Sequence, residues 1–431
     1  KTAYEIMPSL VGSEMCIRDR DEGHNLPSRI RELLTERLSS ITVLRAINEA
    51  TKHGYKETRD TLTVIYNALV RLADEVNHRV NNSIAKEGII PKQRFVNEIE
   101  NDKRSYDEIV AELSFIGEEV LKQQKLSYIS RISTFLQLWL GEDTGFARIL
   151  SVNAGTKGNI ITLSYCCLDP SVVTKDVVEA SHSTILMSGT LTPTSMYKDI
   201  LGFPDKTIQK EYPSQFPSEN RLVMIVPETT TRYTKRTEYE YMKISKLCND
   251  IISVVPGNIA VFFPSYALLD RIYYHIQSQC EKKLLKEKPN MTKKEKEEFL
   301  ESFKSNKKKG AVLLGVASGS FGEGIDLPGE LLKAVVIVGL PLNIPDLYTM
   351  ELIDYYDKKF GRGWDYGYIL PAITKSLQNA GRCIRSETDR GAIVFLDERY
   401  SWPKYKKCFP SDWDVKVTKL YIERLREFFS K

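Results

Sequence analysis

The chain lacks the cysteine patterns that mark disulfide-stabilised or zinc-binding proteins. Its 431 residues include seven cysteines, and no two of them form a C-x-x-C pair. A scattered, odd-numbered set of this kind provides neither a disulfide framework nor a zinc signature. The cysteines therefore favour a reducing compartment, and we expect a cytoplasmic protein.

Long apolar runs and a strong charge of either sign are also missing. No apolar stretch approaches the ~20 residues that a membrane span requires, so we expect no membrane partner. The formal net charge is +4, with 42% hydrophobic and 27% charged residues, which is an ordinary globular composition. So small a charge neither favours nor excludes nucleic acid, because a local basic groove is sufficient for binding.

The first 20 residues do not show the charged-then-apolar pattern of a signal peptide. The segment from Val11 to Arg20 is similar to translated adapter sequence of the kind found at the edges of assembled reads. We therefore expect residues 1–20 to be a non-native segment and leave them out of the fold prediction. For the same reason we expect the chain to be a fragment.

Apolar residues recur at helical spacing between residues 40 and 140. This spacing predicts an all-helical module whose apolar stripes form a core. Two of the clearest stripes are Leu62, Ile65, Leu69, Leu72 and Val76, and then Ile109, Leu113, Ile116 and Val120.

The pattern changes near Gly141, where short apolar runs bounded by turn residues take over. Near-continuous apolar runs of this length are typical of buried parallel strands, and helical patterns separate most of them. The sequence therefore predicts one or more doubly wound α/β lobes. The runs are residues 160–165, 184–190, 222–226, 259–263, 311–316, 334–338 and 392–396.

A highly charged segment interrupts these runs. Residues 282–309 are rich in lysine and glutamate. This composition predicts a solvated helix, and contact with DNA is the alternative.

The stretch from Gln378 to Gly391 carries Arg382 and Arg385 at a fixed spacing. Arg382 and Arg385 lie three residues apart, which predicts that they share one face of a helix, and Gln378 extends that face. Paired guanidiniums suit the clamping of phosphate oxygens during phosphoryl transfer. An arginine-rich surface helix explains the same spacing equally well, so this stretch alone does not decide between the two.

Acidic and small polar residues mark other candidate sites. Asp21 and Glu22 in D-E-G-H suit a magnesium ion held through water and an activated water, although an acidic helix start has the same appearance. In open α/β sheets, ligands bind beyond the carboxyl ends of strands. Polar residues follow predicted strands at Ser188-Gly189-Thr190, at Ser265-Tyr266 and in the glycine-rich loop 317–329, which contains Ser320, Glu323 and Asp326.

Taken in this order, the motifs resemble those of the XPD/DinG-type superfamily-two helicases, with the archaeal XPD branch nearest. The resemblance covers the chain from about residue 21 to its last residue. S-G-T-L-T-P and the last two of the matching strings are specific, whereas the first and third would be weak alone. The strings are D-E-G-H-N-L, I-L-M-S-G-T-L-T-P, V-F-F-P-S-Y, G-S-F-G-E-G-I-D-L-P-G and Q-N-A-G-R-C-I-R-S-E-T-D-R-G.

The resemblance implies an α/β fold with two RecA-like motor domains of the P-loop NTPase class around an ATP site, the first of them incomplete. A helical arch domain is inserted between the D-E-x-H box and the S-G-T motif. By this resemblance, part of motor domain 1 lies at residues 21–39 and the arch at 40–140. The remainder of motor domain 1 lies at 141–215, and motor domain 2 lies at 216–431.

By the same resemblance, Asp21 holds magnesium through water and Glu22 orients or activates the hydrolytic water. Gln378, Arg382 and Arg385 then reach the γ-phosphate. Glu323 and Asp326 then lie at the cleft between nucleotide and DNA. The remaining candidates couple the nucleotide state to DNA grip or bind DNA; they are Ser188, Gly189, Thr190, Ser265, Tyr266 and Ser320.

The chain departs from the family pattern at three points. Gly23 stands where the D-E-x-H box usually has alanine. No Gly-Lys dipeptide occurs anywhere, so the G-x-x-x-x-G-K-[ST] loop that cradles phosphates is missing. The four cysteines of the family's [4Fe–4S] cluster are missing too, and we expect that cluster only in an upstream region.

We therefore expect the parent protein to be an ATP-dependent 5′-to-3′ DNA helicase of excision-repair type, a monomer that uses ATP and Mg²⁺ on single-stranded DNA, with repair proteins as partners. This chain alone is expected to hydrolyse ATP poorly or not at all. Two alternatives stay open: a naturally truncated, non-enzymatic DNA-binding or scaffold protein, and a DinG-like helicase that acts outside excision repair.

Overall fold

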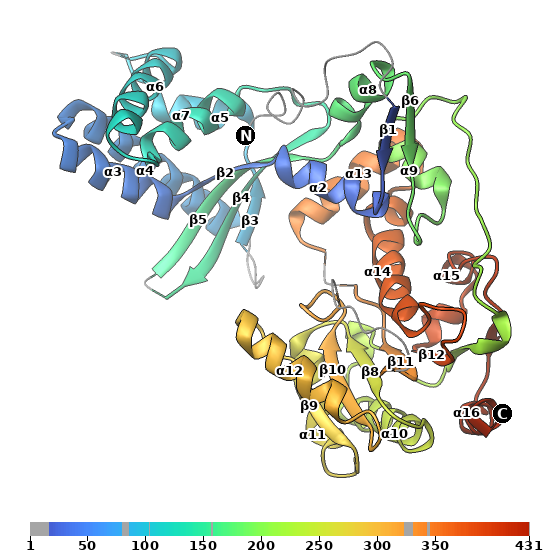
Figure 1. The fold of residues 1–431 in the computed structure, drawn as a ribbon. Helices are drawn as coiled ribbons and strands as arrows, with labels where there is room; N and C mark the ends of the chain where they lie inside the picture. Colours follow the sequence, from blue (N-terminus) through green and yellow to red (C-terminus); the bar gives the residue numbers. More distant parts are fainter. Residues whose placement is uncertain are drawn as a thin grey trace. The chain divides into compact units, whose positions relative to one another are not determined.

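The computed structural model describes residues 17–79, 86–102, 104–156, 158–322, 331–342 and 345–430. The chain divides into two compact units (Figure 1). Unit 1 comprises Lys1–Ser188, Tyr197–Thr207 and Pro345–Gly363. Unit 2 comprises Gly189–Met196, Ile208–Ile344 and Trp364–Lys431.

Unit 1 contains a helical module packed on a four-stranded antiparallel sheet of order β2-β5-β4-β3. Polar caps fix the helix ends: Ser39 Oγ accepts from the Thr42 amide at the start of α3 (3.1 Å), and Ser105 and Glu108 form a capping box on α6. The elements are β2 (Glu36–Ser39), α3 (Ser40–His53), α4 (Lys56–Arg79), β3 (Lys86–Ile89), α5 (Lys92–Ile99), α6 (Tyr106–Gln123), α7 (Tyr128–Trp139), β4 (Phe146–Gly155) and β5 (Gly158–Cys167).

The module is therefore not made of helices alone, and the all-helical prediction for residues 40–140 has to be amended. Strand β3 lies inside that range, and the β4–β5 hairpin shares one buried core with the helices, to which Leu163 of β5, Leu69 of α4 and Leu136 of α7 all belong. Strand β3 is short and polar, and its Gly88 packs so closely on Val76 that a Cβ there would lie 2.7 Å from a valine methyl. A four-residue K-E-G-I segment has no apolar alternation from which a strand could be predicted.

A second, smaller part of unit 1 begins with two parallel strands, β1 (Ile17–Arg20) and β6 (Ser183–Leu186). Arg20 pairs with Leu186, so the two strands end side by side. Residues 17–20, which were expected to belong to a non-native segment, thus form a strand despite their polar side chains. Backbone pairing to β6 determines this strand, and side-chain pattern gives no signal of it.

Three helices complete the described part of unit 1, namely α2 (Leu26–Leu33), α8 (Ser171–Glu179) and α13 (Leu347–Phe360), and α9 (Thr194–Ile200) spans the boundary between the units. Helix α13 belongs to unit 1 although its flanking strands in sequence belong to unit 2. Its Tyr355 hydroxyl and Lys359 ammonium both donate to Asp169, at 2.7 and 2.6 Å. The range 216–431, predicted as one motor domain, therefore includes a helix that packs elsewhere.

Unit 2 is built on a seven-stranded sheet of order β13-β7-β12-β11-β8-β10-β9, with every adjacent pair parallel. Five of the strands coincide with predicted apolar runs. The strands are β7 (Arg221–Ile225), β8 (Ile259–Phe263), β9 (Lys283–Lys286), β10 (Ala311–Val316), β11 (Ala334–Val338), β12 (Gly391–Leu396) and β13 (Val415–Val417).

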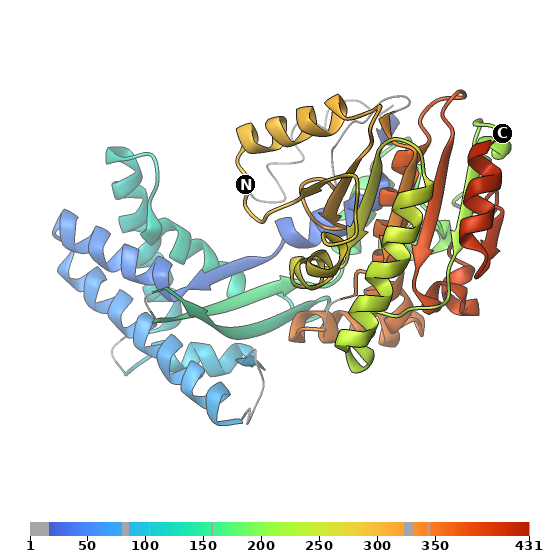
Figure 2. The same cartoon turned by 90° about the horizontal axis from the view of Figure 1, so that it is seen from below.

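Helices cover both faces of this sheet. On one face, Val261, Val336 and Val394 pack against α10 and α16, which lie side by side (Figure 2), and against α11. On the other face, Phe395 contacts Tyr400 and Phe409, and α14 packs on β11. The helices are α10 (Glu238–Val254), α11 (Tyr266–Ile276), α12 (Lys293–Ser305), α14 (Leu370–Ala380), α15 (Pro403–Lys406) and α16 (Tyr421–Ser430).

The charged segment 282–309 is only in part the solvated helix that was predicted. Residues 283–286 form β9, which pairs with β10, and helix α12 begins at Lys293. Leu284 and Leu285 supply the apolar surface for this edge strand, but the surrounding lysines hide the signal. None of the described helices is long and apolar enough to cross a membrane.

Candidate functional site

The acidic motif of unit 1 lies where β1 ends, beside the first residue that follows β6. Asp21 and Glu22 are exposed, and the Glu22 amide donates to Asp21 Oδ1 at 2.7 Å. His24 Nδ1 lies 2.6 Å from Ser188 Oγ and 3.3 Å from Glu22 Oε2. The structure thus brings D-E-G-H and the serine of S-G-T together at the carboxyl edge of a parallel strand pair, where open α/β sheets bind ligands.

Gly23 is the residue that allows this close approach. Its amide donates to the Met187 carbonyl at 2.9 Å, and a Cβ at this position would overlap the Leu186 side chain. The glycine that replaces the usual alanine of the D-E-x-H box therefore matches the packing of Leu186 beneath it. Glu22, just before it, has φ 53° and ψ 36°, a left-handed conformation that non-glycine residues rarely adopt and that is often found at functional sites.

In unit 2, three predicted coupling residues lie at the carboxyl edge of the seven-stranded sheet. Ser265 follows β8 and accepts the Leu268 amide at 3.3 Å, so it is the N-cap of α11. Tyr266 and Ser320, which follow β8 and β10, both bond to Glu287, which follows β9. Burial, with the charge of Glu287 and the hydrogen bond to it, raises the pKa of Tyr266 to about 12.

The Q-N-A-G-R stretch contacts the glycine-rich loop after β10. Asn379 Nδ2 donates to the Ala317 carbonyl at 3.1 Å, and Arg382 Nη2 donates to the Gly322 carbonyl. Asn379 is almost fully buried and also bonds to the Lys375 carbonyl of its own helix at 2.8 Å. Two motifs that are about 60 residues apart in the sequence are therefore joined by side-chain to backbone hydrogen bonds.

The prediction that Arg382 and Arg385 share one helix face is wrong. Helix α14 ends at Ala380, a single 3₁₀ turn covers Gly381–Cys383, and Ile384 is extended. The Asp389 carboxylate accepts the amides of Arg385 and Ser386, both at 2.8 Å, and so stabilises a turn in place of a helix. Gln378 lies half-buried on α14, and Arg385 is exposed beyond the turn.

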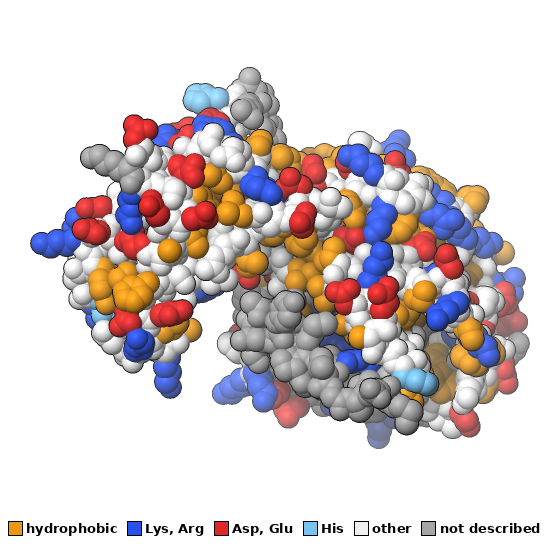
Figure 3. Space-filling model, turned by 90° about the horizontal axis from the view of Figure 1, so that it is seen from above, with side chains coloured by type: hydrophobic (Ala, Val, Ile, Leu, Met, Phe, Trp, Pro, Cys, Tyr) orange, Lys and Arg blue, Asp and Glu red, His pale blue; other side chains and the backbone are white. Residues whose placement is uncertain are grey.

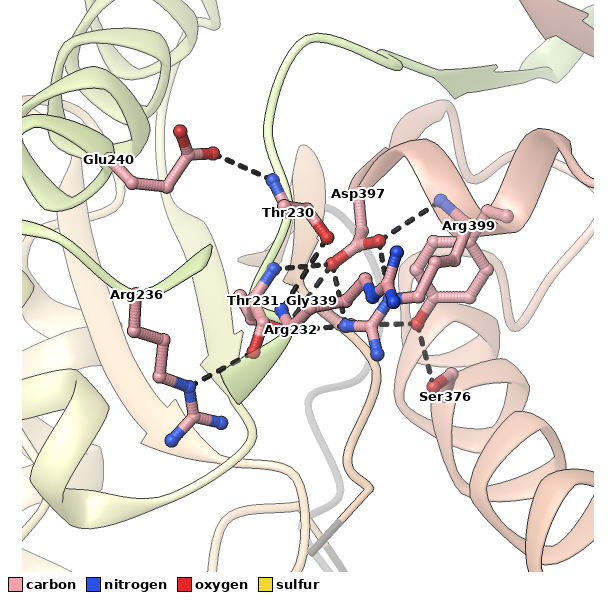
Figure 4. A network of polar contacts seen from close by, with 10 residues as sticks. Thr230, Thr231, Arg232, Arg236, Glu240, Gly339, Ser376, Asp397 and Arg399 are labelled. Atoms are coloured by element: carbon pink, nitrogen blue, oxygen red, sulfur yellow. Dashed lines mark hydrogen bonds and ion pairs between the residues drawn. The ribbon is translucent and has the colours of Figure 1, made fainter. Parts of the chain in front are cut away.

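A buried polar network next to this stretch was not found from the sequence. Asp397, directly after β12, is fully buried and lies between Thr231 and Arg399 (Figure 4). It accepts from Arg399 Nε and Nη2, both at 2.8 Å, and from the Thr231 amide at 2.8 Å. Burial works against the charged Arg399, but the hydrogen bonds and charge of Asp397 outweigh it and raise the pKa of Arg399.

The same network reaches helix α14. The Tyr400 hydroxyl lies 2.9 Å from both the Gly339 carbonyl oxygen and Ser376 Oγ, and Ser376 is on α14 two residues before Gln378. The network therefore connects the segments that follow β7, β11 and β12 to the helix that carries Gln378. In the sequence, this network is indicated only by Asp397 and Arg399, which lie two residues apart directly after the apolar run 392–396.

Some predicted residues are not placed by the described structure. Glu323 and Asp326 lie outside the described residues. Gly189 and Thr190 belong to unit 2 and Ser188 to unit 1, so the S-G-T motif spans the point where the chain passes from one unit to the other. Asp21 and Glu22 belong to unit 1, and Arg382 and Arg385 belong to unit 2.

The donor set of unit 1 suits magnesium and does not suit a larger metal centre. Asp21 and Glu22 provide hard carboxylate oxygens open to solvent, and Mg²⁺ is commonly held by one or two carboxylates together with substrate phosphates. Among the described residues, no group of three or more His, Cys, Asp or Glu could hold a metal ion. The described cysteines form no group that could hold an iron–sulfur cluster.

Surface charge gives no dominant field on the face drawn in Figure 3, where Lys and Arg side chains are interspersed with Asp and Glu. Attraction of a polyanion to this face would therefore depend on local groups.

Comparison with known proteins identifies similar helicases. Residues 248–416 match the family Helicase C-terminal domain. The XPD/RAD3 helicase subunit of general transcription and DNA repair factor IIH from Saccharomyces cerevisiae is 26% identical over 344 residues, which cover 72% of this chain and 43% of that protein. The ATP-dependent DNA helicase XPD of Sulfolobus acidocaldarius is 27% identical over 416 residues, which cover 90% of this chain and 66% of that protein.

A third relative is the ATP-dependent DNA helicase CHL1 of Candida albicans, which is 28% identical over 289 residues, covering 59% of this chain and 33% of that protein. The chain thus spans from 33% to 66% of the length of these curated relatives.

Solved structures agree on the fold. A structure of apo XPD matches with a TM-score of 0.61 at 24% identity, covering 96% of this chain and 79% of that chain. Xpd4 of S. tokodaii matches with a TM-score of 0.65 at 17% identity, covering 95% of this chain and 77% of that chain. The predicted α/β fold of RecA-like type is confirmed.

Proposed function

We propose that this chain, which is similar to XPD-type helicases, forms part of an ATP-dependent 5′-to-3′ DNA helicase that acts in nucleotide excision repair. The observation that carries this proposal is the contact between two motifs in unit 2, in which Asn379 and Arg382 bind the backbone of the Ala317–Gly322 loop. A residue that senses phosphate and a loop that contacts DNA must be joined physically if hydrolysis is to change DNA grip.

In this proposal the chemistry is divided between the two units. Asp21 holds Mg²⁺ through water and Glu22 orients or activates the hydrolytic water, for which their exposed carboxylates at the end of β1 are suited. Arg382 and Arg385, with Gln378, contact the γ-phosphate. Their guanidiniums stabilise the charge that spreads over the phosphate oxygens during transfer.

The coupling residues are those at the carboxyl ends of strands. Ser188 senses the state of the acidic motif through His24, and the chain continues from it through Gly189 and Thr190 into unit 2. In unit 2, Ser265, Tyr266 and Ser320 contact single-stranded DNA, and Glu323 and Asp326 act between nucleotide and DNA. Alternate grip on the strand during closing and opening then produces stepping.

This chain alone lacks the phosphate-binding loop that ATP hydrolysis requires. The 431 residues contain no Gly-Lys dipeptide, and without a backbone loop and lysine nothing cradles the β- and γ-phosphates. We propose that the chain alone turns ATP over at background rate, and no step is assigned to an iron–sulfur cluster.

The proposed setting is a reducing, cytoplasmic one, which the six free described cysteines support. The proposed partners are single-stranded DNA and repair proteins, with the helicase acting as a monomer. The name of the yeast relative refers to transcription and DNA repair, whereas that of the Candida albicans relative calls it only an ATP-dependent DNA helicase. A role outside excision repair is therefore the second candidate, and DNA unwinding is common to both.

Strand displacement tests this proposal. We expect a chimera that joins the ATP-binding region of the Sulfolobus acidocaldarius helicase ahead of Asp21 to unwind a duplex with a 5′ single-stranded overhang and not one with a 3′ overhang. The unmodified 431-residue chain is the control and should unwind neither. Unwinding of the 3′-overhang substrate alone, or displacement by the unmodified chain, would contradict the proposal.

A further inference from the structure

Glu287 is a buried carboxylate at the proposed DNA edge of unit 2. It follows β9 directly, is 1% exposed, and takes part in no ion pair within the part of the chain that the structure describes. A buried carboxylate without a cation is costly unless hydrogen-bond donors surround it. Its partners therefore indicate what it stabilises.

Three donors from three places converge on this carboxylate. Oε2 accepts the Val316 amide at 2.9 Å, and Oε1 accepts the Ser320 amide at 2.7 Å and the Tyr266 hydroxyl at 3.1 Å. Gly319 lies so close that a Cβ there would be 2.5 Å from Oε1. The glycine in G-S-F-G thus gives the carboxylate access to the loop backbone.

The Ala317–Gly322 loop is held from two sides. Asn379 and Arg382 donate to its carbonyl groups at Ala317 and Gly322, whereas Glu287 accepts the amide of Ser320 within it. Phe321 anchors the loop further by stacking on Phe299 of α12, with ring centroids 4.4 Å apart. The loop therefore lies between the proposed phosphate-contacting stretch and a buried acid directly after β9.

We propose that Glu287 is a positioning residue that fixes the shape of the Ala317–Gly322 loop, so that Tyr266 and Ser320 grip single-stranded DNA. The effect on DNA binding, called the DNA part, rests on the proposed function. The effect on the shape of the loop, called the loop part, does not. The segment containing Glu287 was predicted to be solvated, and its role is visible only from the burial and the three donors.

Glu287→Gln is the test variant. Whichever way the amide group turns, its NH₂ faces either the Val316 amide or the Ser320 amide, and that backbone donor loses its acceptor. Losing a charge-assisted hydrogen bond corresponds to about tenfold or more in the opening equilibrium, so hydrogen exchange in the 311–322 segment should speed up by at least that factor. Binding of a fluorescein-labelled oligothymidylate should weaken by about tenfold.

Two further variants and one measurement separate positioning from loss of the fold. Glu298→Gln changes an exposed glutamate of α12 and should alter neither exchange nor DNA affinity. Tyr266→Phe removes one donor and leaves both backbone hydrogen bonds, so exchange in 311–322 should stay within about threefold of wild type. The urea unfolding midpoint, measured in parallel, reports how far Glu287→Gln destabilises the whole fold. If the midpoint falls, exchange is measured at a low temperature at which the variant is still folded, and faster exchange confined to 311–322 then supports the positioning role.

The outcomes distinguish this inference from the proposed function. Unchanged exchange in Glu287→Gln overturns the positioning role. Faster exchange with unchanged DNA affinity overturns the link to DNA. If the wild-type chain does not bind the oligonucleotide, the proposed function and the DNA part both fail, and exchange alone still decides whether Glu287 holds the loop.

Discussion

Arg399→Met is expected to lower the free energy of unfolding by about 3 to 5 kcal/mol, because it leaves a buried charge without its partner. Asp397 has no exposed surface, and the Arg399 side chain is 8% exposed. Methionine fills a similar volume but donates no hydrogen bond, so two of the donors to Asp397 vanish together. Urea unfolding followed by circular dichroism measures the loss.

A surface ion pair of the same unit provides the matched control. Lys294 lies 3.8 Å from Glu298 on α12, and both side chains are more than half exposed. Lys294→Met should therefore change stability by less than about 1 kcal/mol. If Arg399→Met costs no more than this control, the network around Asp397 does not hold the carboxyl edge of the sheet together.

Arg382→Ala is expected to reduce DNA-stimulated ATP hydrolysis by about 10³-fold in the chimera that carries an ATP-binding region ahead of Asp21. An arginine that reaches a transferring phosphate stabilises charge formed only in the transition state, so its removal lowers kcat far more than nucleotide affinity. In this structure Arg382 donates to the Gly322 carbonyl, so its loss also loosens the loop after β10.

Two measurements separate these effects of Arg382. The loop effect alone should weaken single-stranded DNA binding by no more than about tenfold, the equivalent of one hydrogen bond. Arg426→Ala, at an exposed position of α16, is the control and should leave hydrolysis unchanged. Hydrolysis by Arg382→Ala within tenfold of wild type would show that this arginine does not contact the transferring phosphate.

Side-chain pattern predicts the centre of unit 2 well. The apolar runs at 259–263, 311–316 and 334–338 are all buried strands of the parallel sheet, because strands covered on both faces need continuous apolar sequence. Polar residues after these runs could therefore be expected at one edge, and Tyr266 and Ser320 do meet there.

Other elements depend on contacts that sequence does not display. Strands β1, β3 and β9 are short and polar at the positions that matter, and backbone pairing determines them. The turn after α14 results from Asp389 binding the amides of Arg385 and Ser386, which no helical periodicity reveals. Glu287 and Asp397 are buried carboxylates with a structural role. A carboxylate can be buried only where hydrogen-bond donors surround it, and these donors come from distant parts of the chain.

Single-stranded DNA binding by the 431-residue chain tests the central claim most directly. Titration of a fluorescein-labelled oligothymidylate, followed by anisotropy at several salt concentrations, measures it without any need for ATP hydrolysis. The account predicts saturable binding whose log affinity falls linearly with log salt, with a slope of about −0.7 for each phosphate contacted. Absence of binding at low salt, or an affinity that does not change with salt, would contradict the proposal that this chain forms part of a DNA helicase.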